Sequence, residues 1–273
     1  ALARSKNVVS VRLLRAVGID KLMDHLRLFG FTLSPAQRNE ALALGALEVT
    51  PLELVTGYAA LANGGFKVAP YFIDRIEDAE GNLIYGSSPL AACKGCSKPT
   101  QTLPDSATAY LAQTPDWKQQ CAIDPVASTR IAPSIISEAN SFLVAEALHS
   151  AIFGGRDRGM GGTWLGTGWR AAKELGRQDI AGKTGTTNEA KDAWFSGFNN
   201  KIVATAWVGF DDHRRKLGRS IAGNEFGASA AQPIWINFMK VAMKGMPESP
   251  VSQPADVVTL PVNGTTSLGD TTI

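Results

Sequence analysis

The chain of 273 residues lacks a long apolar run, a strong net charge and a leader sequence. No stretch approaches the apolar length that a helix needs to span a bilayer. The formal net charge of +2 gives no electrostatic reason to expect a nucleic-acid partner or an anionic membrane surface. No signal peptide is visible, and the first residue is Ala1 rather than an initiator methionine. We therefore expect the chain to begin inside a domain, so that missing targeting signals say nothing about location.

Cysteine is scarce as well. Cys93 and Cys96 lie in a Cys-Lys-Gly-Cys run, and Cys121 follows later. In an oxidising compartment this set allows one disulfide and one free thiol, without fixing the pairing. A structural zinc would need a fourth ligand at suitable spacing, and a thioredoxin-like motif would need a surrounding βαβ pattern. The sequence offers neither, so we expect structural cysteines, no metal and no cofactor.

The sequence does contain enough apolar and aromatic residues for a substantial core, with 44% hydrophobic and 19% charged residues. Helices are indicated where apolar positions recur at helical spacing between start and stop signals, such as the Thr50–Glu53 capping box. They are expected within 1–17, over 19–29, from 51 to an end at 63–65, over 137–152, over 169–175 and over 228–244. The last of these has one heavy apolar face, suited to covering a sheet.

Strands are indicated by β-branched and aromatic residues between turn signals. One hairpin is expected from Phe72–Ile76 and Leu83–Tyr85. An antiparallel meander is expected from Lys183–Thr187, Asp192–Phe198 and Ile202–Val208. The meander is the predicted sheet of the molecule.

Other stretches have weaker periodicity. Residues 86–133 are rich in Ser, Pro, Gln and Thr and are predicted to be a loop excursion or small insertion, partly mobile. Residues 159–168 are glycine-rich, typical of a hairpin or rim loop. One domain is therefore expected over 1–245, followed by an extended or disordered tail over 246–273.

The most informative motif is Lys-Thr-Gly-Thr-Thr at Lys183–Thr187, because it lies on a predicted edge strand. The lysine can neutralise charge and the threonine hydroxyls can donate hydrogen bonds. Gly185 lets a ligand approach the backbone closely. The motif therefore predicts a receptor for a carboxylate beside a reacting carbonyl.

The same letters could belong to a phosphate-binding loop, G-x-x-x-x-G-K-[ST]. Here five residues instead of four separate Gly176 from Gly182. The preceding segment is charged and helical, and no apolar helical period follows Thr184. Spacing and context both exclude a nucleotide site.

A second motif, Ser5-Lys6-Asn7, lies at the head of the first expected helix. A hydroxyl and a carboxamide two residues apart can point into one cleft, where the hydroxyl relays a proton and the amide holds a substrate amide. Taken alone, Ser5 is more simply interpreted as a helix cap.

Together, the two motifs resemble the second and third signatures of the penicillin-binding, serine D,D-transpeptidase family. Longer stretches are similar to the transpeptidase domain of class A penicillin-binding proteins, and they are spread along the chain: Ser5 to Leu14, Ala43 to Gly65, Gly176 to Asn188, Ala193 to Phe210 and Gly227 to Phe238. The resemblance implies an α/β fold, described as an α+β sandwich, with an antiparallel sheet flanked by helices. An α-rich part is expected over 1–65, across the cleft from the sheet.

The family's first signature, Ser-x-x-Lys, carries its nucleophile, and no serine of this chain has a lysine three residues later. In the family that signature precedes the Ser-x-Asn loop. We therefore expect the nucleophile in an upstream half of the same polypeptide, and we expect this part alone to be inactive. The resemblance also implies a peptidoglycan glycosyltransferase domain in the parent protein.

What the resemblance implies is acyl transfer in two steps on D-Ala-D-Ala stem peptides of peptidoglycan, with β-lactams as inhibitors. Ser5 would help pass a proton to the leaving nitrogen, Asn7 would hold the acyl-side amide, and Lys183 would supply positive potential. Thr184 and Thr186 would receive the terminal carboxylate, and the Thr186 N–H would form half of an oxyanion hole. The implied location is the periplasmic side of the bacterial inner membrane.

Two other functions on the same fold stay open. One is a β-lactam-sensing module that is acylated without turnover, and the other is a hydrolase, either a D,D-carboxypeptidase or a β-lactamase. The remaining candidates have ordinary structural interpretations. Alternating aromatic residues of the meander are expected mostly in the core: Trp194, Trp207 and Phe210. Scattered histidines are expected to be neither ligands nor bases: His25, His149 and His213.

Overall fold

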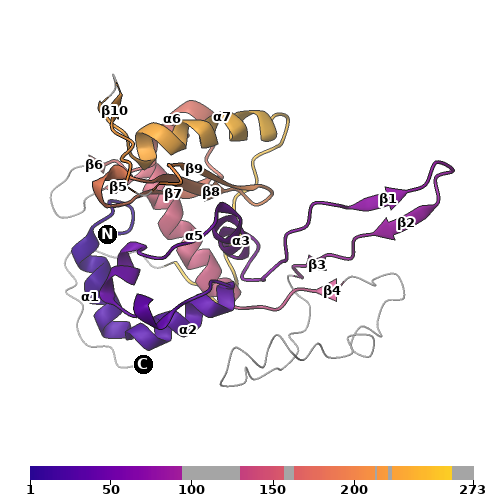
Figure 1. The fold of residues 1–273 in the computed structure, drawn as a ribbon, viewed down its shortest axis with the longest axis horizontal. Helices are drawn as coiled ribbons and strands as arrows, with labels where there is room; N and C mark the ends of the chain where they lie inside the picture. The colour runs from indigo at the N-terminus through magenta and orange to yellow at the C-terminus, as the bar shows by residue number, and fades with distance from the viewer. Residues whose placement is uncertain (94–129, 157–162, 213, 221–222, 260–273) are drawn as a thin grey trace. The chain divides into compact units, whose positions relative to one another are not determined.

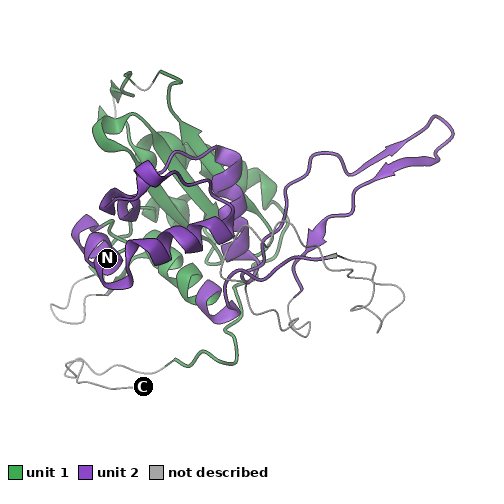
Figure 2. Ribbon diagram, turned by 60° about the horizontal axis from the view of Figure 1, so that its bottom comes forward, with its two compact units in different colours: residues 1–5, 142–273 green, residues 6–141 purple. Residues whose placement is uncertain are grey.

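The computed structural model describes residues 1–93, 130–156, 163–212, 214–220 and 223–259. The chain divides into two compact units (Figure 2). One unit joins Ala1–Ser5 to Phe142–Ile273, and the other is Lys6–Ser141. None of the helices within these described ranges combines the length and apolar character needed to cross a membrane.

The unit formed by Lys6–Ser141 is built on the expected helices. Helix α1 spans Asn7–Val17, α2 spans Ile19–Phe29 and α3 spans Pro51–Ala62, with two 3-10 turns, η1 and η2, at Pro35–Gln37 and Glu40–Leu44. The α2 helix ends at Gly30, whose φ of 96° is accessible to glycine at little cost.

The start of α3 confirms the predicted capping box. The Glu53 N–H donates to Thr50 Oγ1 at 3.2 Å, and the Thr50 N–H donates to Glu53 Oε2 at 2.8 Å. The Pro51 ring costs no hydrogen bond at the first helical position.

The expected hairpin is also present in this unit. Strand β1 (Arg75–Glu77) pairs antiparallel with β2 (Leu83–Gly86), with an irregularity after Ile76. Two short strands, β3 (Leu90–Ala91) and β4 (Arg130–Ile131), pair in parallel at the two ends of the predicted excursion. Most of that excursion lies outside the described residues.

The other unit contains the predicted meander. Strands β7 (Ala181–Thr186), β8 (Ala193–Phe198) and β9 (Val203–Val208) form an antiparallel sheet in the order β7-β8-β9. Helix α6 (Trp169–Leu175) leads into β7, and α7 (Gln232–Ala242) contacts β8 and β9 (Figure 1). A π-helical turn, η5 (Gly227–Ala231), precedes α7.

The remaining elements of this part of the chain are one long helix and two short hairpins. Helix α5 spans Glu138–Phe153 and begins in the Lys6–Ser141 unit. Strands β5 (Gly155–Arg156) and β6 (Thr163–Trp164) pair antiparallel. Only β6 lies within the glycine-rich stretch 159–168, and residues 157–162 lie outside the described ranges. Strands β10 (Arg219–Ser220) and β11 (Gly223–Asn224) form the second hairpin.

The core of this unit lies between α7 and the sheet. Its largest side chains are at most 1% exposed: Trp235, Phe195, Phe198, Ile152, Ile180, Ile236 and Met239. Each such side chain contributes roughly 1.5–3 kcal/mol by burial. The Trp235 indole N–H donates to the Ala204 carbonyl at 3.1 Å, so its burial leaves no unpaired donor.

The prediction that Trp194, Trp207 and Phe210 lie mostly in the core is wrong. Trp194 and Phe210 are half-buried and Trp207 is exposed. The two tryptophans face each other across β8 and β9 with ring centroids 5.9 Å apart. Because side chains alternate along a strand, Phe195 lies on the face opposite Trp194 and occupies the core in place of the tryptophans.

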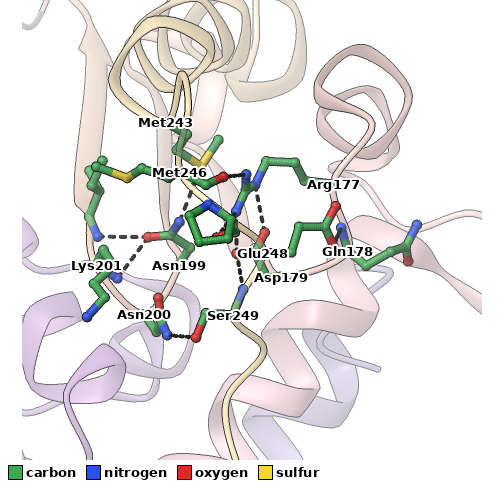
Figure 3. Close-up of polar contacts among 12 residues, drawn as sticks. Arg177, Gln178, Asp179, Asn199, Asn200, Lys201, Met243, Met246, Glu248 and Ser249 are labelled. Carbon is green, nitrogen blue, oxygen red and sulfur yellow. Dashed lines mark hydrogen bonds and ion pairs between the residues drawn. The ribbon is translucent and has the colours of Figure 1, made fainter.

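The segment after α7 is fastened to the loop before β7 (Figure 3). Arg177 pairs with Asp179 at 2.6 Å, and it also donates to the Met246 carbonyl at 2.8 Å. The Ser249 N–H donates to Asp179 Oδ2 at 3.1 Å, and Asn200 donates to the Ser249 hydroxyl. We call these contacts the clasp. The beginning of the predicted tail is therefore hydrogen-bonded to the sheet unit.

Cysteine and histidine have structural roles where the structure describes them. Cys93 is disulfide-bonded, while Cys96 and Cys121 lie outside the described residues. His149 stacks on Phe153 at 4.1 Å and contacts the Gln178 carbonyl at 3.0 Å. His25 packs edge-on against Phe29, and His213 lies outside the described residues.

Candidate functional site

The candidate site is built on β7, which lies at one edge of the sheet. Its partner β8 occupies one side, and the other side pairs with no strand in the described part of the chain. Such an edge presents unpaired backbone donors and acceptors. The predicted motif Lys183–Thr186 forms the second half of this strand.

Lys183 contacts the second motif directly. Its ammonium donates to the Ser5 hydroxyl, and it also donates to the Thr184 carbonyl at 2.9 Å. Burial lowers the pKa of Lys183 to about 8, because desolvation disfavours the charged form. A lysine with such a pKa can bind an anion as an ammonium and can also exchange a proton near neutral pH.

Ser5 is held in a conformation that is uncommon for a serine. Its φ is 50°, in the left-handed region, and its N–H donates to the Leu2 carbonyl at 3.0 Å. The Thr167 N–H donates to the Ala3 carbonyl at 3.2 Å, and Ala3 is buried. Backbone strain of this kind clusters at functional sites, where the surroundings over-determine the conformation.

Thr184 contacts Thr167, a residue that the sequence analysis did not identify as part of the site. Its hydroxyl donates to Thr167 Oγ1 at 2.9 Å. The next residue along the loop, Gly168, accepts from the buried Gln232 side chain of α7 at 2.8 Å. Thr167 lies at the end of the glycine-rich stretch, where the sequence predicted a hairpin or rim loop. Its position among small residues gave no signal of a hydroxyl network.

Thr186 connects β7 to the start of the C-terminal helix. Its Oγ1 accepts from the Gly227 N–H at 3.0 Å. A Cβ at Gly227 would lie 2.5 Å from the Gly185 carbonyl and 2.6 Å from the Trp194 carbonyl. Only glycine therefore fits where η5 begins against the strands.

Gly185 has a packing reason besides the predicted access for a ligand. It lies opposite Trp194 in the register, and a Cβ there would be 3.1 Å from the Trp194 Cβ. Thr187 is engaged within the chain, since its hydroxyl accepts from the Asp192 N–H at 2.8 Å. Asp192 also accepts from the Trp207 indole at 3.0 Å. The contribution of Thr187 to substrate binding stays a prediction.

Asn7 is the first residue of α1 and is exposed. It belongs to the unit formed by Lys6–Ser141, whereas Ser5, Lys183 and the threonines belong to the other unit. The structure brings together Ser5, Lys183 and Thr184, and the cooperation of Asn7 with them stays a prediction. The assembled groups are one ammonium, several hydroxyls and a free strand edge, a combination suited to holding a carboxylate and moving a proton.

Known proteins are similar to this chain in sequence and in fold. The family model for the penicillin binding protein transpeptidase domain matches residues 1–240. Penicillin-binding protein 1A of Escherichia coli (strain K12) is 40% identical over 97% of this chain and 34% of its own length. Penicillin-binding protein 1A of Vibrio cholerae is 39% identical over 98% of the chain and 31% of its own length. The chain thus spans about a third of the length of these relatives.

Solved structures of penicillin-binding proteins have a similar fold. The crystal structure of penicillin-binding protein 1A from Haemophilus influenzae superposes with a TM-score of 0.75 at 40% identity, over 94% of this chain and 36% of that one. A penicillin-binding protein from Mycobacterium tuberculosis, at 19% identity and a TM-score of 0.58 over 92% of this chain and 61% of that one, shares the fold. The expected fold class is confirmed. The chain therefore belongs to the penicillin-binding protein transpeptidase domain family, among relatives of penicillin-binding protein 1A.

Proposed function

We propose that the protein to which this chain belongs is a serine D,D-transpeptidase that crosslinks the stem peptides of peptidoglycan. The observation that carries the proposal is the hydrogen bond from Lys183 to Ser5, made on a free strand edge beside Thr184 and Thr186. A cation and two hydroxyls on such an edge suit a substrate that ends in a carboxylate one residue beyond its reacting carbonyl.

In the first step, a serine hydroxyl attacks the carbonyl between the two terminal D-alanines. The C–N bond breaks, the acyl group stays on the serine as an ester, and D-alanine leaves after its nitrogen gains a proton. Ser5 passes that proton to the leaving nitrogen, and Lys183 keeps the Ser5 hydroxyl oriented. In the second step, the amine of another stem peptide attacks the ester, an amide forms and the serine regains its proton.

The strand binds the substrate in this scheme. Thr184 and Thr186 hold the terminal carboxylate in the positive potential of Lys183, and the Thr186 N–H donates to the carbonyl oxygen as it becomes negative. The Gly227 contact fixes the Thr186 side chain. Asn7 holds the amide on the acyl side. Losing one oxyanion donor costs about 3–4 kcal/mol of transition-state stabilisation.

The nucleophilic serine and its lysine base are assigned to the part of the parent protein outside this chain, since no serine here is followed by lysine three residues later. The same parent is proposed to carry a glycosyltransferase domain and to act on the periplasmic side of the inner membrane. This chain supplies the substrate-binding wall, and its partner in catalysis is the upstream half of its own polypeptide.

The test is covalent labelling of the complete polypeptide with a fluorescent penicillin. We expect stoichiometric labelling of the wild type and a loss of about a hundredfold in acylation rate for Lys183→Ala, because the charge beside the carboxylate and the hydrogen bond that orients Ser5 are both removed. Lys240→Ala is the matched control, since that lysine lies exposed on α7. A wild type that takes no label contradicts the proposal. Long-lived label without D-alanine release from a stem-peptide mimic would indicate a β-lactam sensor instead.

A further inference from the structure

The short loop that carries Thr167 is held from both sides. The Gly168 N–H donates to the Ala151 carbonyl of α5 at 2.8 Å, and the buried Gln232 side chain of α7 donates to the Gly168 carbonyl at 2.8 Å. A Cβ at Gly166 would lie 2.1 Å from the Ala151 carbonyl oxygen, so only glycine lets the loop lie directly on the helix. Thr167 therefore has a fixed backbone position.

Thr167 joins the segment before Ser5 to the strand of the candidate site. Its N–H donates to the Ala3 carbonyl at 3.2 Å, and its hydroxyl accepts from Thr184 at 2.9 Å. Ala3 is buried and Thr167 is half-buried. These residues all belong to the unit that contains the sheet. One threonine thus connects the turn that places Ser5 with the strand that places Lys183.

The two threonines of the strand differ in the direction of their hydroxyl protons. Lys183 donates to Thr184 Oγ1 at 3.4 Å, and an ammonium has no lone pair, so the Thr184 proton is left for Thr167. Thr186 Oγ1 accepts from the Gly227 N–H at 3.0 Å and donates to no residue that the structure describes. A carboxylate only accepts hydrogen bonds. Thr186 can therefore donate to a carboxylate at once, whereas Thr184 must first turn its proton away from Thr167.

We propose that Thr167 is a positioning residue, which holds Thr184 ready for the carboxylate of the substrate. This inference rests on the proposed function. In the free protein, Thr167 accepts the Thr184 hydrogen bond. When the carboxylate binds, the Thr184 O–H turns to the carboxylate, and the Thr167 O–H turns to donate to the Thr184 oxygen. Both hydroxyls keep their protons throughout.

The exchange uses the full hydrogen-bonding capacity of Thr184. With the carboxylate bound, its oxygen accepts from Lys183 and from Thr167, and its proton is donated to the carboxylate. Hydrogen bonds in such a chain polarise one another, so donation by Thr167 strengthens donation by Thr184. Removal of the Thr167 hydroxyl should therefore weaken recognition of the carboxylate and spare recognition of the rest of the ligand.

The test measures how strongly acylation depends on the carboxylate of the ligand. The complete polypeptide is acylated by a penicillin and by the same penicillin with its carboxylate converted to a neutral carboxamide, and intact-protein mass spectrometry follows both reactions. The ratio of the two rates is the carboxylate discrimination. We expect Thr167→Val, which has nearly the same shape, to lower this ratio about tenfold. Thr167→Ser keeps the hydroxyl and should keep the ratio. A loss of packing alone would slow both reactions equally.

Thr205→Val is the matched control. Thr205 also forms a hydroxyl–hydroxyl hydrogen bond of 2.9 Å, with Ser196, but it lies on β9, two strands from the free edge. This variant should keep the wild-type ratio. Thr184→Val should lower the ratio by itself, and Thr167→Val added to it should lower the ratio no further. Thr167→Ala removes the same hydroxyl with a smaller side chain, and it replaces the valine variant if that variant does not fold.

An unchanged ratio in Thr167→Val or Thr167→Ala overturns the inference, as does a further loss in the double variant. When the wild type is labelled and discriminates, such a result contradicts this inference alone. A wild type that neither penicillin labels contradicts the proposed acyl transfer, and the inference falls with it. Equal rates of the wild type with the two penicillins contradict carboxylate binding by the strand, and with it the role given to Thr167.

Discussion

At the scale of single residues, the site contains one lysine whose protonation state changes close to neutral pH. Lys183 is half-buried and donates to the Ser5 hydroxyl, and burial lowers its pKa to about 8. The ammonium is the dominant form at pH 7, and the neutral amine dominates above pH 8. The proposed binding of the substrate carboxylate and the proposed proton relay through Ser5 should therefore respond to pH in the same range.

We expect the KM for a D-Ala-D-Ala peptide to rise as the pH increases through 8, by about tenfold per unit above it, since only the ammonium attracts the carboxylate. Lys183→Arg should remove this break because the guanidinium stays charged. Steady-state kinetics between pH 6 and 10 checks the prediction. A KM that stays flat across this range contradicts the role given to Lys183.

Gly227 supports the site through its lack of a side chain. Gly227→Ala places a Cβ within 2.6 Å of two strand carbonyls, so η5 must move and the hydrogen bond to Thr186 is lost. We expect about 1–3 kcal/mol of destabilisation, together with slower acylation by penicillin. Gly86→Ala is the control, since its nearest contact is an ordinary 3.4 Å. Equal acylation rates for Gly227→Ala and wild type would refute this role of the glycine.

At the scale of elements, the clasp fixes the start of the strand that carries the site. Asp179 is 1% exposed and its partner Arg177 13%, and two residues later β7 begins at Ala181. Burial alone raises the pKa of Asp179, but the Arg177 guanidinium and the Ser249 N–H outweigh it and hold the pKa below its ordinary value.

Asp179→Asn should destabilise the chain by about 3 kcal/mol at pH 7, because it leaves the Arg177 charge without its partner. A carboxyl whose pKa is lowered in the folded state stabilises at neutral pH, and this contribution is lost as the pH falls through and below the ordinary aspartate value. The difference from wild type should therefore shrink in acid. Thermal unfolding at several pH values measures it.

The matched control for the clasp is an exposed pair. Asp20 and Arg38 are 71% and 53% exposed and form a bidentate contact, so Asp20→Asn should change stability by less than about 1 kcal/mol. An equal effect of the two substitutions would show that burial of the clasp pair adds nothing to the free energy of unfolding.

Elements with strong local signals were predictable from the sequence. The capping box before α3, the glycine ends of α1 and α2, and the three strands of the meander lie where turn and cap residues indicate. Which face of the meander packs against a helix was not predictable in the same way. Trp194 and Trp207 alternate as core residues do, yet the partner helix α7 packs on the opposite face, around Phe195. The alternation of side chains along a strand defines two faces of the sheet, and it does not show which face a helix covers.

The site was predictable only in part for a similar reason. Lysine, glycine and hydroxyls in one strand carry a chemical signal by themselves, and Ser5 gains meaning from its motif. Thr167 and Gly227 act through tertiary contacts, with Thr184 and Thr186, that bridge distant segments.

At the scale of the whole molecule, we propose that the chain supplies one part of a larger active site. It spans about a third of the length of its curated relatives. It carries the strand proposed to bind substrate and the serine proposed to relay a proton, while it contains no Ser-x-x-Lys sequence. Binding and nucleophilic attack are thus assigned to different parts of one polypeptide. Under this proposal, the binding part and the nucleophilic part of the polypeptide must act on the same substrate carbonyl.

The most direct test of that requirement is the crosslinking reaction itself, followed by mass spectrometry. The complete polypeptide is given a D-Ala-D-Ala stem peptide as donor and a second stem peptide as amine acceptor. We expect a covalent donor–acceptor dimer and one released D-alanine per dimer, and we expect both products to be lost together in Lys183→Ala. Release of D-alanine without any dimer would contradict transpeptidation and indicate a carboxypeptidase, and undiminished dimer formation by Lys183→Ala would contradict the assigned site.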